Sequence, residues 1–368
     1  MRLALLAFFG LLIMACDGGS DAPECSQPGP VSACATDVAV SQDHRCVIRT
    51  DGALLCWGSN YSGEVGDGTM IMRGTPVQVP GLTNVVAVAV AGSSISGSAS
   101  YTCAVEGAGA LYCWGGGPLG TGAASSLTPV KLPLADVVAV SAGGAHACAI
   151  SKAGALSCWG SNSFGQIGVD AADTSMPTPV TGIGPVESVA ACRASTCAVQ
   201  TDKRLFCWGF GPLGVAAQGE SSAPIEVMAD VEQVACVPAG NIGENACARR
   251  SDGSVVCWGR GDYGVLGNGM LTASDTPTPV SSVADAVDLS VGGQHACAIT
   301  DDGVLWCWGG VYQAAEAPVP QALACPAEPA QIASGPNEGC VIDGAGGLWC
   351  FDAAIGRSPP SPLEIPCP

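Results

Sequence analysis

The sequence predicts an all-β protein, a seven-bladed β-propeller, and three observations support this. Fourteen of its 21 cysteines form seven pairs whose members are ten residues apart, and successive pairs begin 43 to 57 residues apart. Six of these pairs enclose a glycine at the same position. Each repeat holds about four short strand-like segments and no convincing amphipathic helix. Four-stranded repeats that cannot bury their faces alone stack radially into a propeller. A linear β-solenoid is the alternative, but its repeats are usually much shorter.

The first pair, within RCVIRTDGALLCWG at 45–58, predicts a disulfide across a β-hairpin. If residues 50–52 form a three-residue loop, Gly52 supplies its positive φ and Cys46 faces Cys56. The two cysteines then occupy a pair without mutual backbone hydrogen bonds, where Cα atoms are about 4.5 Å apart and a disulfide fits. The fourth repeat has Lys203 where the others have glycine. The predicted disulfides are Cys46–Cys56, Cys103–Cys113, Cys148–Cys158, Cys197–Cys207, Cys247–Cys257, Cys297–Cys307 and Cys340–Cys350.

Six further cysteines lie outside these pairs and outside the leader. Zinc binding by the paired cysteines is disfavoured, because structural zinc sites use Cys-x2-4-Cys spacing. For the six we expect disulfides between residues at similar repeat positions or close in sequence, with a bond between Cys34 and Cys367 as an open alternative. The expected pairs are Cys192–Cys236, Cys325–Cys367 and Cys25–Cys34.

The N-terminus predicts export. Residues 1–15 have one basic residue and then an apolar run that is too short to span a membrane, which is typical of a signal peptide. The run ends in Ile-Met-Ala before Cys16, which resembles the lipobox of bacterial lipoproteins and implies that Cys16 carries the lipid. An ordinary signal peptide is the alternative. Residues 16–30 are rich in Gly and Pro and predict a flexible tether. We therefore expect a lipoprotein of the cell envelope, in the inner or the outer membrane, where disulfides form.

Residues 31–368 resemble the RCC1 (regulator of chromosome condensation) repeat family. The resemblance rests on SNYSGEVGDGT, SNSFGQIGVD and RGDYGVLGNG, each after Cys-Trp-Gly, and on GAHACAI and GQHACAI in the preceding strand. The repeats with WGGGPLG, WGFGPLG and Cys350-Phe351 depart from this pattern. The family implies a seven-bladed propeller that holds proteins on its faces and loops, and the cysteine pairs resemble exported bacterial members. Guanine-nucleotide exchange is not expected, because no residues match that activity.

The two ends of the chain contain similar elements. SPLEIPCP at 361–368 matches TPVQVPGL, which separates the first two repeats, and GPVSAC at 29–34 resembles it too. We therefore expect the last segment to lie beside the first blade and to close the ring, which removes an open sheet edge.

The composition and the isolated histidines argue against several functions. The net charge is −19 with no basic run, which disfavours nucleic-acid binding. Three histidines, His44, His146 and His295, recur two residues before the first cysteine of a pair, in non-adjacent blades. We interpret them as structural, and we expect no metal site, cofactor or catalytic group. Tryptophans at one repeat position predict packing between blades; they are Trp57, Trp114, Trp159, Trp208, Trp258 and Trp308.

The function that remains is a membrane-anchored, monomeric protein-binding scaffold whose partner is unknown. Two turns are longer than their equivalents, SSISGSAS at 93–100 and VPAGNIGEN at 237–245. Because binding residues concentrate on surface loops, we expect contacts there, although drift in tolerant loops explains the lengths equally well. The alternative is an envelope enzyme, or a metal-binding or ligand-binding propeller, that uses its central channel.

Overall fold

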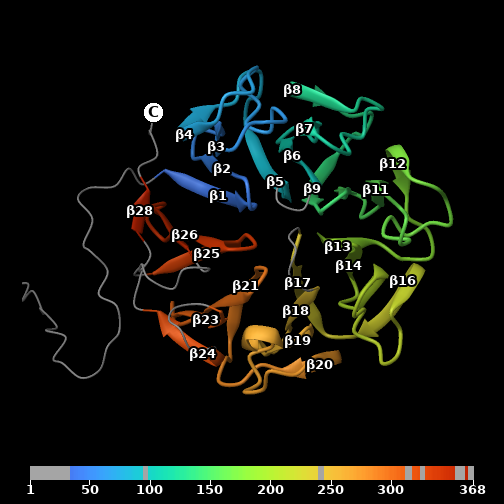
Figure 1. Ribbon diagram of the computed structural model, residues 1–368, viewed down its shortest axis with the longest axis vertical. Coiled ribbons are helices and arrows are strands. Elements are labelled where there is room, and N and C mark those ends of the chain that lie inside the picture. Colours follow the sequence, from blue (N-terminus) through green and yellow to red (C-terminus); the bar gives the residue numbers. More distant parts are fainter. Residues whose placement is uncertain are drawn as a thin grey trace, which may run out of the picture.

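A computed structural model describes residues 34–93, 98–238, 244–310, 317–323, 328–352 and 361–363. These residues form seven four-stranded antiparallel sheets around a central channel, so the predicted seven-bladed propeller is confirmed (Figure 1). The signal peptide, Cys16, the tether, Cys25, Cys325 and Cys367 lie outside the described residues. No helix among the described residues is long and apolar enough to span a membrane.

Each blade takes four consecutive strands, with the first strand innermost (Figure 1). Blade 1 comprises β1 (Ala35–Val40), β2 (His44–Arg49), β3 (Leu54–Gly58) and β4 (Arg73–Gln78). Blade 2 comprises β5 (Val85–Ser93), β6 (Ser98–Glu106), β7 (Leu111–Gly116) and β8 (Ser125–Lys131). Blade 3 comprises β9 (Val137–Ala142), β10 (His146–Ser151), β11 (Leu156–Gly160) and β12 (Thr174–Pro179). Blade 4 comprises β13 (Val186–Ala191), β14 (Ser195–Gln200), β15 (Leu205–Phe210) and β16 (Glu220–Met228).

Blades 5 to 7 repeat this order. Blade 5 comprises β17 (Val231–Cys236), β18 (Asn245–Arg250), β19 (Val255–Gly259) and β20 (Ser274–Pro279), with the short 3-10 helix η2 (Asp262–Gly264) before β20. Blade 6 comprises β21 (Ala286–Val291), β22 (His295–Thr300), β23 (Leu305–Gly309) and β24 (Ala317–Leu323). Blade 7 comprises β25 (Pro329–Ser334), β26 (Glu338–Asp343), β27 (Leu348–Asp352) and β28 (Ser361–Leu363).

Among the described residues the ring closes without exchange of strands, which corrects the expectation for residues 361–363 of the last segment. Strand β28 pairs with β27 in its own blade, because β4 already provides the outer strand of blade 1. The Ala35 amide instead donates to the Gly346 carbonyl at 2.9 Å, across the boundary between blades 7 and 1. The Val85 amide makes the same bond to Gly52 between blades 1 and 2. The first and last blades therefore meet through the same backbone contact that joins blades 1 and 2.

The hairpins have the predicted register. Cys46 faces Cys56, their Cα atoms are 4.1 Å apart, and a disulfide joins them. The other six predicted hairpin pairs are also disulfide-bonded, and Cys192–Cys236 joins blades 4 and 5. Cys34 is disulfide-bonded too. Local hairpin disulfides thus fasten the two middle strands of every blade.

The glycine of the first hairpin loop meets two demands. Gly52 has a φ of 75°, and a Cβ atom on it would lie 2.6 Å from the Cα of Asn84 in the connection to blade 2. Lys203 keeps the left-handed conformation of this position with a φ of 68°. Its ammonium group binds Glu187 in its own blade and Glu232 in the next, both at 2.7 Å. The departure in the fourth repeat therefore places an ion-pair bridge between blades 4 and 5.

The six repeating tryptophans are buried between blades, as predicted. The indole N–H of Trp114 in blade 2 donates to the Glu64 carbonyl of blade 1 at 3.0 Å. Trp208 makes the same bond to Gln166, and Trp308 makes it to Val265. In these three tryptophans the preceding blade satisfies the polar atom of the ring, so the side chain fixes the spacing of two blades as well as filling the core.

Candidate functional site

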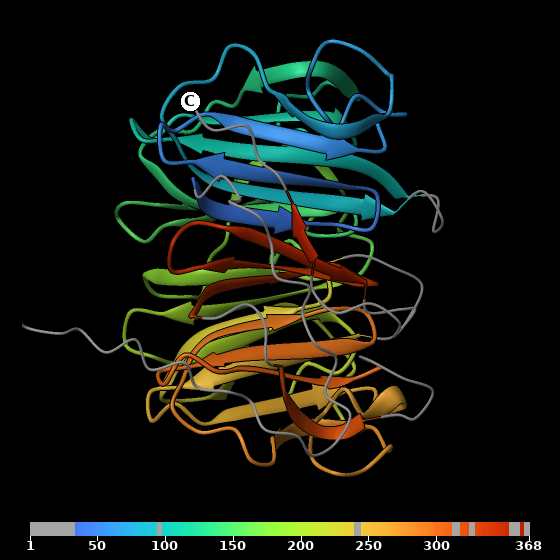
Figure 2. The ribbon, with the colours of Figure 1, turned by 90° about the vertical axis from the view of Figure 1, so that its left-hand side faces the viewer.

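The two faces of the disc differ in their loops. The inner strands end on one face, where the segments between third and fourth strands also lie, and we call this the loop face. In Figure 2 it is on the right, where η2 lies. The opposite face carries the short hairpin turns at 50–52 and its equivalents. Three of the segments on the loop face are long and two are short: 59–72, 161–173 and 260–273 against 117–124 and 211–219.

Large apolar side chains gather on the long segments and the strands beside them. Met70, Ile71 and Met72 are consecutive, and their exposed fractions are 58%, 61% and 62%. The rings of Phe164 and Phe210 lie 5.1 Å apart at the boundary between blades 3 and 4. We call the whole set the apolar rim. Exposed apolar clusters of this kind mark interaction surfaces. Its members are Tyr61, Met70, Ile71, Met72, Leu127, Phe164, Met176, Phe210, Tyr263, Met270, Leu271 and Val319.

A buried asparagine organises the long segment of blade 1. The Asn60 side-chain amide donates to the carbonyl oxygens of Thr69 at 3.0 Å and Ile71 at 3.2 Å, and its oxygen accepts from the Val65 amide at 2.9 Å. Asn162 makes the equivalent bonds within segment 161–173. One side chain thus ties each loop into a fixed shape, so the apolar residues at its tip are held outward.

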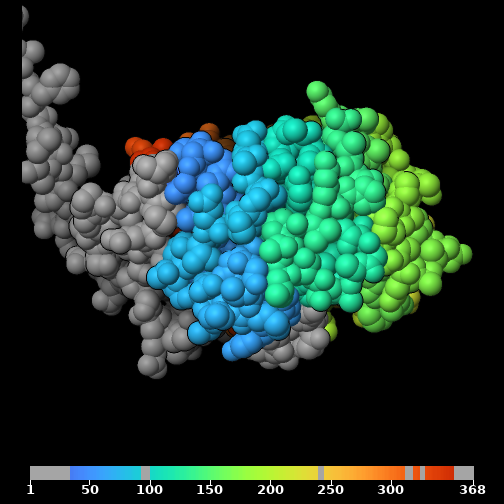
Figure 3. All heavy atoms as spheres, turned by 90° about the horizontal axis from the view of Figure 1, so that it is seen from above, coloured from blue at the N-terminus to red at the C-terminus, as the bar shows by residue number. Residues whose placement is uncertain are grey.

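The long segments also rest on the next blade. The Gly68 amide donates to the Leu127 carbonyl of β8 at 3.0 Å, and Gly269 donates to Pro318 of β24 at 2.8 Å. A Cβ atom on Gly63 would lie 2.5 Å from the Leu127 side chain. Each segment therefore joins two blades, and the surface of blades 1 to 3 is continuous (Figure 3).

The three histidines lie in different blade boundaries and do not converge. His44 Nε2 is 2.7 Å from the Thr102 hydroxyl in blade 2, and His146 is equally far from Thr196 in blade 4. His295 faces blade 7, where Gly339 replaces the threonine and Phe351 lies edge-on to the imidazole. Burial lowers the pKa of each histidine to about 4, so all three are neutral at pH 7. In the part of the chain that is described, no metal-binding group of His, Cys, Asp or Glu occurs.

The central channel is lined by small and apolar residues. A cavity of about 350 Å³ contacts the inner strands of all seven blades. Opposite the first cysteine of each hairpin the inner strand carries only alanine or serine: Ala39, Ala89, Ser141, Ala190, Ala235, Ser290 and Ala333. Asp37 and Asp288 lie two residues before Ala39 and Ser290 on the same inner strands. Each carboxylate accepts a hydrogen bond from a glutamine side-chain amide: Gln331 donates to Asp37 at 2.6 Å, and Gln233 donates to Asp288 at 2.8 Å. No lysine, arginine or histidine is among the residues that line this cavity.

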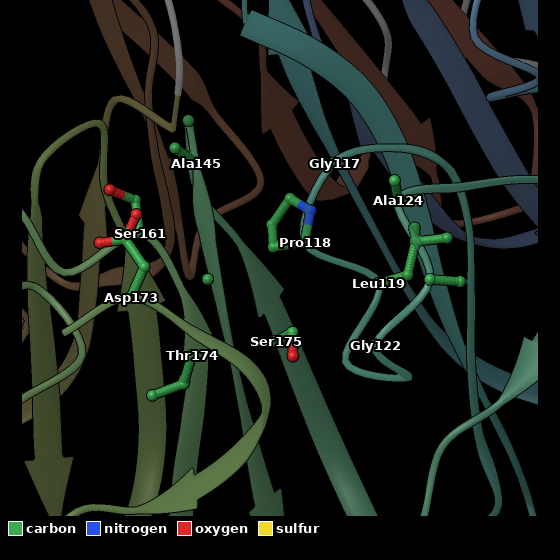
Figure 4. Close-up of a pocket in the computed structure, with 13 residues that line it drawn as sticks. Gly117, Pro118, Leu119, Gly122, Ala124, Ala145, Ser161, Asp173, Thr174 and Ser175 are labelled. Carbon is green, nitrogen blue, oxygen red and sulfur yellow. The ribbon is translucent and has the colours of Figure 1, made fainter. Parts of the chain in front are cut away.

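The larger cavity, about 670 Å³, lies on the loop face between blades 2 and 3 (Figure 4). Gly117, Pro118 and Ala124 form one wall, while Ser161 and Asp173 are on the other. Because its walls come from the segments after the third strands, the cavity belongs to the same face as the apolar rim.

The two long turns expected to bind lie only partly within the described residues. Strand β5 ends at Ser93 and β6 begins at Ser98, on the loop face, while 94–97 and 239–243 lie outside. The apolar rim was missed from the sequence, because a run such as Met70-Ile71-Met72 can be core or surface. A signal was available in the chain, since three of the segments after Cys-Trp-Gly are about five residues longer than the others.

Comparison with known proteins identifies the repeats. Two family models described as regulator of chromosome condensation (RCC1) repeat match the chain, one at 35–64 and 137–166 and one at 51–104 and 252–299. The structure is similar to human WBSCR16, with 19% identity over 85% of this chain and 95% of that chain and a TM-score of 0.72. It is also similar to Prp20p from Saccharomyces cerevisiae, with 20% identity over 81% of this chain and 80% of that chain and a TM-score of 0.67. At these identities the likeness establishes the fold alone.

Proposed function

This chain is an RCC1-repeat propeller, and on that premise we propose that it is a non-enzymatic scaffold that binds a protein on its loop face. The observation that carries the proposal is the apolar rim, whose twelve large side chains are exposed on the long segments and the strands beside them. The Asn60 and Asn162 hydrogen bonds hold two of these segments in place. Aromatic side chains and methionine are enriched in protein–protein interfaces relative to the rest of the surface. The likeness to Prp20p gives a precedent, since that protein is described with binding properties to Gsp1p and histones.

We further propose that the propeller is held at the cell envelope through a lipid on Cys16. The support is the lipobox-like sequence and the eight disulfides joining described residues, which persist in an oxidising compartment. Replacement of Cys16 by serine is expected to abolish labelling of the protein by an alkyne fatty acid. Retained labelling would refute the anchor and leave the binding proposal in place.

Crosslinking from defined positions tests the binding face. A photo-crosslinking residue replaces Ile71, Phe164 or Leu271 of the rim. In the matched controls it replaces Val86, Val138 or Val287, which are about half exposed on the opposite face. Envelope extracts are irradiated, and crosslinked proteins are identified by mass spectrometry. We expect one protein to be captured from the rim positions and not from the valines. That protein, once purified, is then expected to bind the wild-type ectodomain and to bind the Met70→Ser/Ile71→Ser/Met72→Ser variant at least tenfold more weakly.

Two results would contradict the proposal. Capture from the valine positions alone would move the binding site to the hairpin-turn face. Capture from neither face, together with a turnover or a bound metal that depends on His146 or His295, would favour an enzyme. Near-UV circular dichroism of each variant verifies that the fold is retained.

A further inference from the structure

The cavity between blades 2 and 3 has one charged side chain. Of its thirteen lining residues only Asp173 is ionisable, and the rest are glycine, alanine, proline, leucine, serine and threonine. Asp173 is exposed, and one carboxylate oxygen accepts from the Asn162 amide at 2.7 Å. No lysine or arginine within the described ranges forms an ion pair with it. The second oxygen is therefore left to solvent at the edge of the cavity.

The backbone donors around the cavity are largely engaged. The amide of Gly122 donates to the Ser175 carbonyl at 3.1 Å, and that of Ser161 donates to Ala145 at 2.8 Å. The amides of Gly117, Leu119 and Gly144 also donate to carbonyl oxygens. The groups that remain to bind a ligand are the Asp173 carboxylate and hydroxyls, including the buried Thr174 hydroxyl, which has no partner among the described residues. The cavity consequently favours a ligand that brings donors and positive charge.

The geometry points to a basic side chain of the bound protein, lysine or arginine, inserted between blades 2 and 3. Its charged group would reach the Asp173 carboxylate and the Ser161 hydroxyl, and its aliphatic stem would lie along Pro118 and Ala124 on the facing wall (Figure 4). Long basic side chains pack their methylene groups on apolar surface in this way. An anionic group is disfavoured, since the lining contains no base. The inference rests on the proposed function, because the basic residue belongs to the protein held by the rim.

The net charge supports a basic partner independently of the cavity. The chain has 32 acidic and 13 basic residues, so its surface potential is negative and attracts positively charged proteins over a distance. Long-range attraction alone, however, would not distinguish one carboxylate from another. A specific role for Asp173 is therefore separable from the overall charge.

A peptide titration tests the cavity directly. The probes are the capped pentapeptide Gly-Ala-Lys-Ala-Gly and the same peptide with an acetylated lysine, titrated into the disulfide-bonded ectodomain and followed by NMR. We expect the lysine peptide to shift signals of 117–124 and 173–175, and the acetylated peptide to have no such effect. Asp173→Asn is expected to weaken binding about tenfold, because hydrogen bonds to charged groups are the stronger ones.

Two variants control for charge and for shape. Asp170→Asn removes the same charge from an exposed position of the same loop, and binding is expected to stay within twofold of the wild type. Ala124→Phe fills the cavity from an exposed position without changing the charge, and it is expected to abolish binding. The inference is overturned if the acetylated peptide binds as well, if both aspartate variants weaken binding equally, or if no peptide binds.

The peptide titration and the crosslinking experiment can contradict the cavity inference and the proposed function independently of each other. Peptide binding without capture of any protein from the rim would leave the cavity assigned and refute the proposed function. A second pattern would retain the proposed function and refute the inference about the cavity. In that pattern a partner is captured from the rim, it binds the Asp173→Asn variant and the wild type with equal affinity, and no peptide binds.

Discussion

The imidazole of His44 and the hydroxyl of Thr102 join blades 1 and 2 through a 2.7 Å hydrogen bond. The neighbouring Glu64 carbonyl decides which of the two groups is the donor. Thr102 donates its only hydroxyl proton to the Glu64 carbonyl at 2.8 Å. His44 must therefore donate from Nε2, so the neutral ring carries its proton there. His146 and Thr196 repeat the arrangement, with the Gln166 carbonyl as the acceptor. At the boundary of blades 7 and 1 the equivalent positions hold Glu338 and Arg45, an ion pair.

Replacement of Thr102 by valine tests the value of this bond. The Glu64 carbonyl keeps its bond from Trp114, so the variant leaves only the His44 N–H unsatisfied in a buried site. We expect the free energy of unfolding to fall by about 1–3 kcal/mol in urea titrations. Ala296→Gly controls for packing, because Ala296 is buried at the equivalent place in blade 6 and the preceding blade has Asn245 at the histidine position. A double-mutant cycle with His44→Phe should give a favourable coupling energy between the two side chains. Additive effects of the two substitutions would contradict the pairing.

Removal of disulfides should destabilise the protein according to loop length. In the chain-entropy model, Cys46→Ala/Cys56→Ala, which opens a separation of 10, should lower the free energy of unfolding by about 3 kcal/mol. Cys192→Ala/Cys236→Ala opens a separation of 44 and should cost about 4 kcal/mol. Guanidinium denaturation under oxidising conditions measures both. Equal stability of the wild type and the first double variant would contradict a stabilising role for the hairpin bonds.

Glu244 should make stability fall as the pH rises toward neutrality. Burial raises the pKa of its carboxyl to about 7 against a weaker opposing effect of Arg193, and one of its oxygens has no partner among the described atoms. Between about pH 4.5 and 7 the folded protein then binds more protons than the unfolded chain, so the free energy of unfolding decreases with pH. Glu244→Gln should be more stable than the wild type above pH 7, by at most about 3 kcal/mol, and equal to it below pH 4.5.

The buried histidines act in the opposite direction, which the measurement must separate. Their lowered pKa values mean that the unfolded chain binds more protons between about pH 4 and 6.5, so stability rises with pH there. The difference between the Glu244→Gln and wild-type curves cancels this contribution. Glu220→Gln, at an exposed position, should produce no such difference. A difference that does not vary with pH would refute the role of Glu244.

Lys203 allows backbone strain and ion pairing to be measured apart. Lys203→Ala keeps a side chain in the left-handed conformation and loses both ion pairs, so it should destabilise by up to about 1 kcal/mol, because exposed pairs are screened. Lys203→Gly loses the same pairs but removes about 1 kcal/mol of strain, and its stability should be close to that of the wild type. The two variants are compared by thermal unfolding at low and high salt. Greater destabilisation by glycine than by alanine would be inconsistent with strain at this position.

Most of the fold was predictable because it rests on local chemistry that repeats. The spacing of Cys46 and Cys56 with Gly52 specified the hairpin, and its repetition specified the number of blades. The closure at Ala35 was not predictable, because the bond to Gly346 joins residues more than 300 positions apart. The pairing of His44 with Thr102 had a detectable signal, since His146 and Thr196 recur at the same repeat positions. The apolar rim depends on which way the loop tips point, and that follows from the Asn60 and Asn162 bonds rather than from apolarity.

The contiguous construction of the blades has a consequence for oxidative folding. Under the export proposed above, a chain that emerges N-terminus first brings each hairpin cysteine to its partner before the cysteine of the next hairpin appears, so sequential oxidation yields the native bond where no other cysteine intervenes. Cys192 is different, because Cys197 follows it after five residues while its partner Cys236 comes later than both Cys197 and Cys207. Sequential oxidation would join Cys192 to Cys197 and leave blades 4 and 5 unlinked. Both native bonds, Cys192–Cys236 and the hairpin bond Cys197–Cys207, are therefore expected to depend on a thiol–disulfide isomerase, while the other six hairpins are expected to mature with an oxidant alone.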